Sequence, residues 1–117
     1  MTDHFVRVLA TIANETLARK IAIELVELRL AACVQRTPII SVYGWKGQKC
    51  ENSEIELAIK TCTCCLGAIK AILHKDSLYD ITQILVCPIL DGDEKYLQWL
   101  QSNIACNQIS KSKANYE

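Results

Sequence analysis

Three cysteines close together in the middle of the chain are the residues best suited to chemistry. They stand in the segment Cys62-Thr-Cys64-Cys65, where a strand pattern gives way to a helix pattern. Thiols at a helix N-terminus can have a lowered pKa, and thiolates are soft ligands for Cu(I) or Zn(II). Side chains two apart in a strand point the same way, so the sulfurs of Cys62 and Cys64 could converge on one ion. The segment therefore predicts a soft-metal site formed by Cys62, Cys64 and Cys65.

The alternative for these cysteines is packing, because buried cysteine commonly serves as a small hydrophobic residue. A closed four-ligand zinc site is not expected, since no second cysteine pair and no nearby histidine accompany the segment. Cys33 and Cys87 lie in apolar strand patterns and are expected in the core. Neither His4 nor His74 stands at a spacing that indicates nucleophilic catalysis. We therefore expect a protein that is not an enzyme.

The composition favours one small domain without a nucleic-acid or membrane partner. The 117 residues include 13 basic and 13 acidic side chains, and half of all residues are hydrophobic. This balance provides no basic patch for nucleic acid, and no apolar stretch approaches the roughly 18 residues of a membrane helix. We expect a single domain over residues 1–106, followed by an aperiodic, frayed tail over residues 107–117.

The cysteine count indicates a cellular compartment. Seven cysteines, an odd number, stand in a chain whose first residues, Met1–His4, are polar and run directly into a strand pattern. Such a start does not resemble a signal peptide, and an odd count does not fit a disulfide framework. We therefore expect reduced thiols and a cytoplasmic protein.

Hydrophobic periodicity predicts the elements that must position these residues. Alternation predicts strands over residues 5–12, 32–46, 53–63 and 84–90, and a turn over residues 47–52. Helical spacing predicts helices over residues 15–30 and 64–75, and a third helix capped by Asp93. Asn14 is the expected N-cap of the first helix. Pro38 has no backbone donor, so we expect the long second strand to bend or break there.

The order β-α-β-β-α-β-α predicts an α+β fold. It is a split βαβ unit repeated, which gives a ferredoxin-like βαββαβ sandwich with an added C-terminal helix. Right-handed crossovers place both main helices on one face of the sheet. The other face, beside a long hairpin that carries Tyr43 and Trp45, would then be uncovered. A second copy of the chain is the simplest cover, so we expect a closed homo-oligomer.

A series of residues in this order resembles the CutA family of divalent-cation tolerance proteins. The resemblance runs over residues 5–101 and is carried by Leu30-Ala-Ala-Cys-Val34, Pro38, Ser41, Tyr43, Trp45, Gly47, Glu54, Lys60-Thr61, Tyr79, Pro88, Gly92, Tyr96-Leu97 and Trp99-Leu100. It implies a ferredoxin-like domain that assembles into a homotrimer, with copper or another divalent cation as the associated ion and no established reaction. It also implies a shape similar to the trimeric PII signalling proteins, which bind effectors between subunits.

One segment departs from the family pattern. Where the family commonly has His-Pro-Tyr-Glu-x-Pro-Glu, this chain has Ser77-Leu-Tyr79-Asp80-Ile-Thr-Gln83. The tyrosine is kept and an acidic residue remains, but the histidine and both prolines are absent. Histidine is a preferred copper and zinc ligand, so this segment lacks the residue that metal binding there would need.

The resemblance also indicates residues for a cleft between subunits. The expected cleft residues are Tyr43, Trp45, Glu54, Lys60, Tyr79 and Asp80. The alternatives are a solvated or ion-paired strand face for the charges and interface packing for the aromatic rings. Two hypotheses follow. The first is a trimer of metal homeostasis that binds a soft cation or small effector in its clefts. The second is a PII-like signalling or scaffold trimer that binds a small anion or a protein partner.

Overall fold

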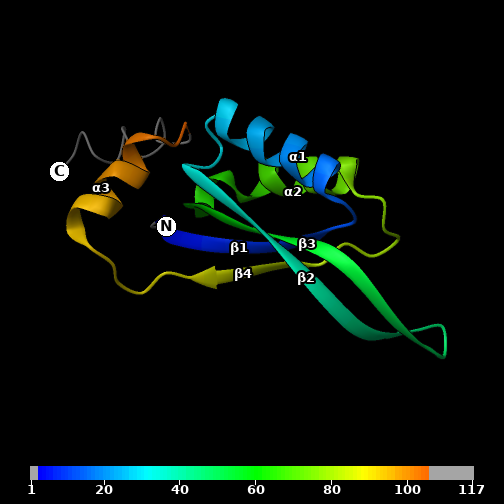
Figure 1. The fold of residues 1–117 in the computed structure, drawn as a ribbon. Helices are drawn as coiled ribbons and strands as arrows, with labels where there is room; N and C mark the ends of the chain where they lie inside the picture. The colour runs from blue at the N-terminus through cyan, green and yellow to red at the C-terminus, as the bar shows by residue number, and fades with distance from the viewer. Residues whose placement is uncertain (1–2, 106–117) are drawn as a thin grey trace.

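The computed structural model describes residues 3–105. Its elements follow one another in the order that the sequence predicts (Figure 1). They are β1 (Phe5–Ile12), α1 (Glu15–Glu27), β2 (Cys33–Trp45), β3 (Gln48–Cys62), the 3-10 turn η1 (Thr63–Cys65), α2 (Leu66–Asp76), β4 (Ile84–Pro88) and α3 (Glu94–Ser102). The predicted tail over residues 107–117 lies outside the described residues. None of the described helices is long and apolar enough to cross a membrane.

The four strands form one antiparallel sheet in the order β2-β3-β1-β4. Helices α1 and α2 lie side by side over one face of this sheet, as the sequence predicts (Figure 1). The core fills the space between them. Val8, Leu57 and Ile59 from the sheet and Leu25 and Leu73 from the helices are completely buried. Burial of such side chains stabilises the fold by about 1.5–3 kcal/mol each.

The strand register defines the opposite face of the sheet, which we call the open face. Residues paired directly across strands project to the same side. Ile59 pairs with the fully buried Val8 and therefore faces the helices. Its neighbour Lys60, which pairs with Arg7, must project to the open face. By the same alternation Glu54 belongs to the open face, together with its β2 partner Ile39.

The β2–β3 hairpin is longer and more regular than the sequence predicts. β2 runs through Pro38 without interruption, so the expected break there is wrong. β2 is an edge strand, where a missing backbone donor is tolerated. The predicted turn over residues 47–52 is also wrong, because β3 already begins at Gln48. Lys46 (φ 51°) and Gly47 (φ 78°) form a two-residue turn whose positive φ angles match the twist of the strands.

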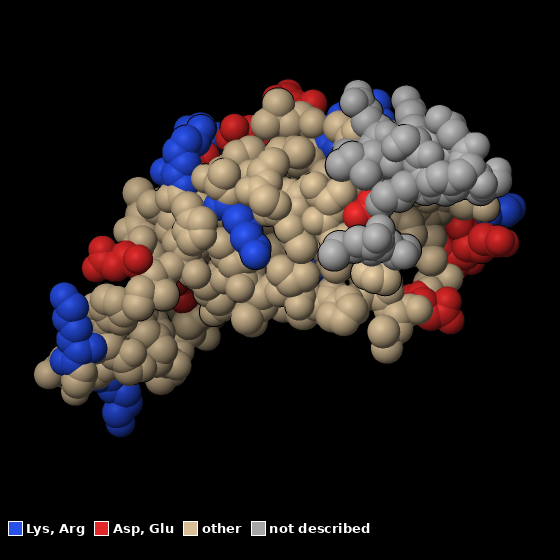
Figure 2. Space-filling model, turned by 180° about the vertical axis from the view of Figure 1, so that it is seen from behind, with Lys and Arg blue, Asp and Glu red and all other residues tan. Residues whose placement is uncertain are grey.

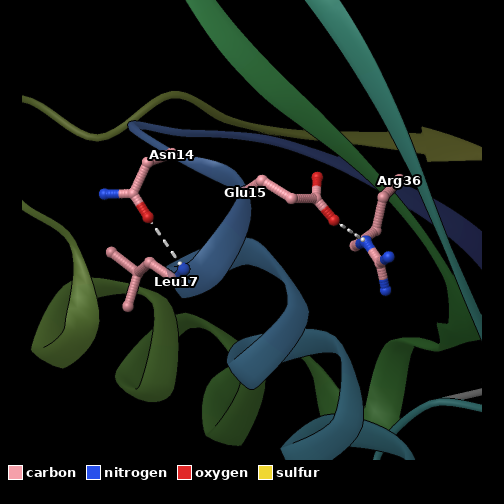
Figure 3. Close-up of polar contacts among 4 residues, drawn as sticks. All are labelled: Asn14, Glu15, Leu17 and Arg36. Carbon is pink, nitrogen blue, oxygen red and sulfur yellow. Dashed lines mark hydrogen bonds and ion pairs between the residues drawn. The ribbon is translucent and has the colours of Figure 1, made fainter.

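Local hydrogen bonds explain where α1 begins and ends. Asn14 Oδ1 accepts from the backbone N–H of Leu17 at 2.9 Å, which confirms the predicted N-cap (Figure 3). Beside it, Glu15 pairs with Arg36 of β2 at 2.8 Å (Figure 3). α1 ends at Glu27, three residues before its predicted end, because Arg29 adopts a left-handed conformation (φ 58°). The Leu30 N–H then bonds back to the Leu25 carbonyl and closes the helix end.

α3 begins at its predicted cap and is fastened to the rest of the chain at its far end. The Asp93 carboxylate accepts from the Tyr96 N–H at 3.1 Å, which confirms this cap. At the other end, the Arg29 guanidinium donates to the carbonyl of Ser102 at 2.7 Å. The preceding strand, β4, ends at Pro88 instead of residue 90. α3 lies at the end of the molecule near the start of β1 (Figure 1).

Candidate functional site

Two of the three predicted metal ligands come together at the end of β3. The Sγ atoms of Cys62 and Cys64 are 3.1 Å apart. This is longer than the roughly 2.05 Å of a covalent S–S bond, so the two sulfurs are neighbours without being bonded to each other. Cys62 is buried and Cys64 is partly exposed. The pair therefore offers two soft ligand atoms at the β3–η1 junction.

Asp3 adds a carboxylate beside the two sulfurs, and the sequence did not predict its presence there. One carboxylate oxygen of Asp3 and the two sulfurs all lie within 4.8 Å of one another. The chain holds Asp3 there by extending the β1–β3 pairing, with His4 N–H donating to Thr63 Oγ1 at 3.1 Å and Thr63 N–H donating to the His4 carbonyl at 2.9 Å. Asp3 is remote from Cys62 in sequence, and the only available signal was the antiparallel register of these two strands.

Cys65, Cys33 and Cys87 are not part of the group formed by Asp3, Cys62 and Cys64. Cys65 is only 1% exposed and packs in the core, apart from the cluster of Asp3, Cys62 and Cys64. Cys33 and Cys87 are partly exposed, so their expected core position is wrong. They pair with Lys60 and Arg7 on the open face. Cys64 is disulfide-bonded in this structure, which differs from the reduced thiols that we expected. Metal binding through its sulfur therefore requires the reduced chain.

Five of the six expected cleft residues line one pocket of about 680 Å³ on the open face. It lies between the β2–β3 hairpin and the loop that follows α2. Its lining consists of Thr11, Ser41, Val42, Tyr43, Trp45, Glu54, Leu78, Tyr79, Asp80, Ile81 and Gln83. The chain thus brings together residues from two strands and a distant loop. Neither Cys62 nor Cys64 lines it, so this pocket is separate from the group of Asp3, Cys62 and Cys64.

Glu54 and Tyr79 form the central polar contact of this pocket. The Tyr79 hydroxyl donates a hydrogen bond to Glu54 Oε2. Glu54 is 7% exposed, although a charged side chain is rarely so buried without a partner. Burial raises the pKa of Tyr79 well above its usual value, and the hydrogen bond to Glu54 and the charge of Glu54 raise it further. Tyr79 therefore stays protonated and acts as a donor.

Short-range contacts hold the other walls of the pocket. Asn52 of β3 donates its side-chain N–H to the hydroxyl of Tyr43. On the loop, Ser77 Oγ accepts from the Tyr79 N–H at 3.0 Å and from the Thr82 hydroxyl at 2.8 Å. These bonds give the segment that departs from the family pattern a defined conformation without its prolines.

Lys60 is the expected cleft residue that the structure places elsewhere. Its Nζ atom lies 5.9 Å from the centre of the Tyr96 ring of α3. This distance is typical of a cation–π contact. Lys60 is not among the residues that line the pocket. Two of the remaining candidates, Glu54 and Asp80, are carboxylates, so the pocket is acidic.

The fold defines a class: an α+β protein with a four-stranded antiparallel sheet, three helices and a long projecting hairpin. The family model described as CutA1 divalent ion tolerance protein matches residues 6–103, and the chain belongs to this family. The divalent-cation tolerance protein CutA of Thermus thermophilus is 40% identical over 97 residues, covering 82% of this chain and 94% of that protein. Protein CutA of Mus musculus is 35% identical over 106 residues, covering 90% of this chain.

Solved structures of family members share the fold. The divalent cation tolerance protein of Thermus thermophilus superposes with a TM-score of 0.82 at 38% identity, covering 86% of this chain and 99% of that one. CutA1 from Oryza sativa gives a TM-score of 0.83 at 32% identity, and the match covers 86% of this chain and 94% of that one. The chain spans about half the length of the mouse and human relatives (56% and 51%). The relatives from Thermus thermophilus and Pectobacterium atrosepticum are named as divalent-cation tolerance proteins.

Proposed function

We propose that this chain is a non-enzymatic protein of metal homeostasis that binds a soft cation, Cu(I) or Zn(II), through Cys62, Cys64 and Asp3. The observation that carries the proposal is the meeting of two sulfurs and a carboxylate within 4.8 Å. Thiolates select soft ions, and three protein ligands leave a coordination position for water or a further ligand. The family name, divalent ion tolerance, agrees with a role in handling metal ions.

We also propose that the working form is a homotrimer of ferredoxin-like subunits. The strand order β2-β3-β1-β4, with two helices on one face, agrees with a ferredoxin-like sandwich. The open face and the hairpin expose large apolar side chains, including Val42 (63%) and Leu85 (54%). Seen from behind, a broad part of the surface also carries few charged side chains (Figure 2). Contact between copies would remove such apolar area from water.

The metal proposal is tested by competition between the reduced protein and a coloured Cu(I) chelator. Cys62→Ser and Cys64→Ser should each weaken Cu(I) binding at least about tenfold, since even loss of an outer-shell partner commonly has an effect of that size. Asp3→Asn should weaken it less, because the soft ion depends mainly on sulfur. Cys87→Ser is the matched control and should bind as the wild type does. Unchanged stoichiometry and affinity in the double cysteine variant would refute the proposal.

The second candidate is a PII-like signalling or scaffold trimer that binds a small anion or a protein partner. The open-face pocket favours a role in ligand binding, because it combines aromatic walls with a buried polar group. Its two carboxylates disfavour an anion, since like charges repel. A protein partner is therefore the stronger version of this candidate. Retention of a partner by the double cysteine variant, with metal binding lost, would favour it.

For the compartment we propose the cytoplasm, because a thiolate site needs a reducing environment. The relatives occupy more than one compartment: an Arabidopsis thaliana relative is described as chloroplastic and an Archaeoglobus fulgidus relative as periplasmic. Fractionation of cells that express the full protein, followed by immunodetection, tests this placement. Recovery of the protein in the fraction that contains an oxidising compartment would contradict the cytoplasmic placement.

A further inference from the structure

We propose that the open-face pocket binds a small organic cation, an amine or guanidine with an apolar body. This inference goes beyond the metal site, because it concerns a different set of residues at a different place in the fold. It rests on three properties of the pocket: its charge, its aromatic walls and its size.

The charge of the pocket selects a cation. Glu54 and Asp80 line it, and none of its lining residues is lysine or arginine. Glu54 is more than nine-tenths buried, and Tyr79 is its one hydrogen-bond partner among the described residues. Within the same part of the chain, no lysine or arginine forms an ion pair with it. Burial of a carboxylate without a cation is unfavourable, so a bound ammonium or guanidinium would gain a strong charge-assisted hydrogen bond.

The aromatic walls favour an organic cation over a bare metal ion. Tyr43, Trp45 and Tyr79 line the pocket together with the apolar side chains Val42 and Ile81. Ring faces attract ammonium and guanidinium groups, and apolar walls pack against the carbon skeleton that carries them. Trp45 already accepts one such contact, since the Lys46 ammonium lies 5.8 Å from its ring centre. Hard metal ions instead require several oxygen ligands.

The size of the pocket limits the class of ligand. Its volume is about 680 Å³, within the range of roughly 300–1,000 Å³ that is usual for small-molecule sites. The hydrogen bond from Tyr79 fixes one carboxylate oxygen of Glu54 in advance. The pocket is therefore suited to a compact amine whose charged end meets Glu54 and whose apolar end lies between the hairpin and the loop.

The experiment compares three probes of one shape and different charge. Benzylamine, benzyl alcohol and benzoate are titrated into the full-length protein at neutral pH and followed by calorimetry and by chemical shifts of the Trp45 indole. Benzylammonium should bind at least about tenfold more tightly than benzyl alcohol, since a hydrogen bond to a buried charge is worth that much. Benzoate should not bind. Equal binding of all three, tighter binding of benzoate, or failure of benzylammonium to bind would overturn the proposal.

Two variants assign the effect to the pocket. Glu54→Gln removes the charge but keeps an oxygen that can accept from Tyr79, and it should weaken benzylammonium binding about tenfold. Glu51→Gln alters an exposed glutamate of the same strand outside the pocket and should have no effect. Circular dichroism checks that both variants are folded, and Asp80→Asn supplies a second test if Glu54→Gln is not.

A last experiment on the assembled protein distinguishes a free amine from a lysine of another copy of the chain. The same ammonium chemistry could come from a lysine of a second copy of the chain instead of a free amine. A crystal structure of the benzylamine complex separates these sources. An amine between Trp45 and Glu54 would support the proposal, whereas a lysine side chain of another copy in that place would overturn it. Because Cys62→Ser leaves the pocket residues unchanged, benzylammonium binding should survive in that variant even if the metal proposal fails.

Discussion

The hydroxyl of Tyr79 donates a hydrogen bond to the buried carboxylate of Glu54 and so joins the loop after α2 to the middle of β3. The two residues are 25 positions apart in sequence. Their contact fixes the loop against the open face and gives the pocket an acidic centre. Loss of either partner should therefore affect both the stability of the fold and the ligand that the pocket accepts.

The raised pKa of Tyr79 predicts a pH dependence at the alkaline end. Burial and Glu54 hold the folded-state pKa above the unfolded value of about 10, so the folded chain keeps the proton longer. The corresponding stability is present below about pH 10 and is lost as the pH rises through the folded-state pKa. Urea unfolding at increasing alkaline pH should show a steeper loss in the wild type than in Tyr79→Phe. Parallel losses would contradict this explanation.

Removal of the Tyr79 hydroxyl should also weaken the fold at neutral pH. Tyr79→Phe leaves the buried Glu54 without its donor, which should lower the free energy of unfolding by about 1–2 kcal/mol. Tyr43→Phe is a useful comparison, because its hydroxyl accepts from Asn52 and not from a charged group. Equilibrium unfolding in urea measures both. An effect of Tyr79→Phe no larger than that of Tyr43→Phe would show that the charged hydrogen bond adds nothing.

The N-cap of α1 should contribute measurably to stability. Asn14→Ala removes the acceptor for the Leu17 N–H and should reduce the free energy of unfolding by about 1 kcal/mol. Asn14→Asp keeps an oxygen in that place and adds a charge that the helix dipole favours, so it should be close to the wild type. Thermal and urea unfolding of the two variants measure these effects. Similar losses in both variants would mean that the cap oxygen is not the cause.

Assembly through the open face predicts different effects for two equally exposed leucines. Leu85 of β4 is 54% exposed and lies on the open face, because it pairs with Leu9, which in turn pairs with Ala58. Leu28 follows the end of α1, on the helix side of the sheet, and is 52% exposed. Leu85→Lys should reduce the trimer fraction in light scattering after gel filtration, because it would bury a charge. Leu28→Lys should assemble as the wild type does. Equal behaviour of the two variants would place the contact elsewhere.

The state of Cys64 predicts that metal binding depends on reductant. A disulfide sulfur is a poor ligand compared with a thiolate, so the oxidised chain should bind Zn(II) far more weakly than the reduced chain. Titration of both forms with a zinc indicator measures the difference. Cys33→Ser should preserve it, because Cys33 is not one of the grouped residues Asp3, Cys62 and Cys64. Equal affinity before and after reduction would exclude Cys64 as a ligand.

The sequence predicted the elements and their order well because each carries its own signal. Asn14 and Asp93 cap helices through their own side chains, so local chemistry was enough to find them. The errors arose where another part of the chain determines the local structure. Pro38 is tolerated because β2 is an edge strand, and the hairpin turn is set by Lys46 and Gly47 rather than by the polar residues that follow.

The candidate sites show the same limit. Cys62 and Cys64 meet although β3 ends at Cys62 and Cys64 lies in η1, so the strand alternation that predicted their meeting is not its cause. Asp3 joins them through pairing between distant strands. Cys65 continues the same sequence run but points into the core, since the chain turns into η1 at this place. Lys60 was grouped with the pocket residues by resemblance, and only the position of α3 and Tyr96 shows that it lies apart.

The most direct test of the proposed metal-binding trimer is native mass spectrometry of the reduced full-length protein, with and without Cu(I) or Zn(II). We predict a trimer that takes up one ion per subunit in the wild type. We also predict a bare trimer when Cys62→Ser and Cys64→Ser are combined. A monomer would contradict the proposed assembly. A trimer that stays bare in the wild type, or that binds metal equally well without the two cysteines, would contradict the metal site.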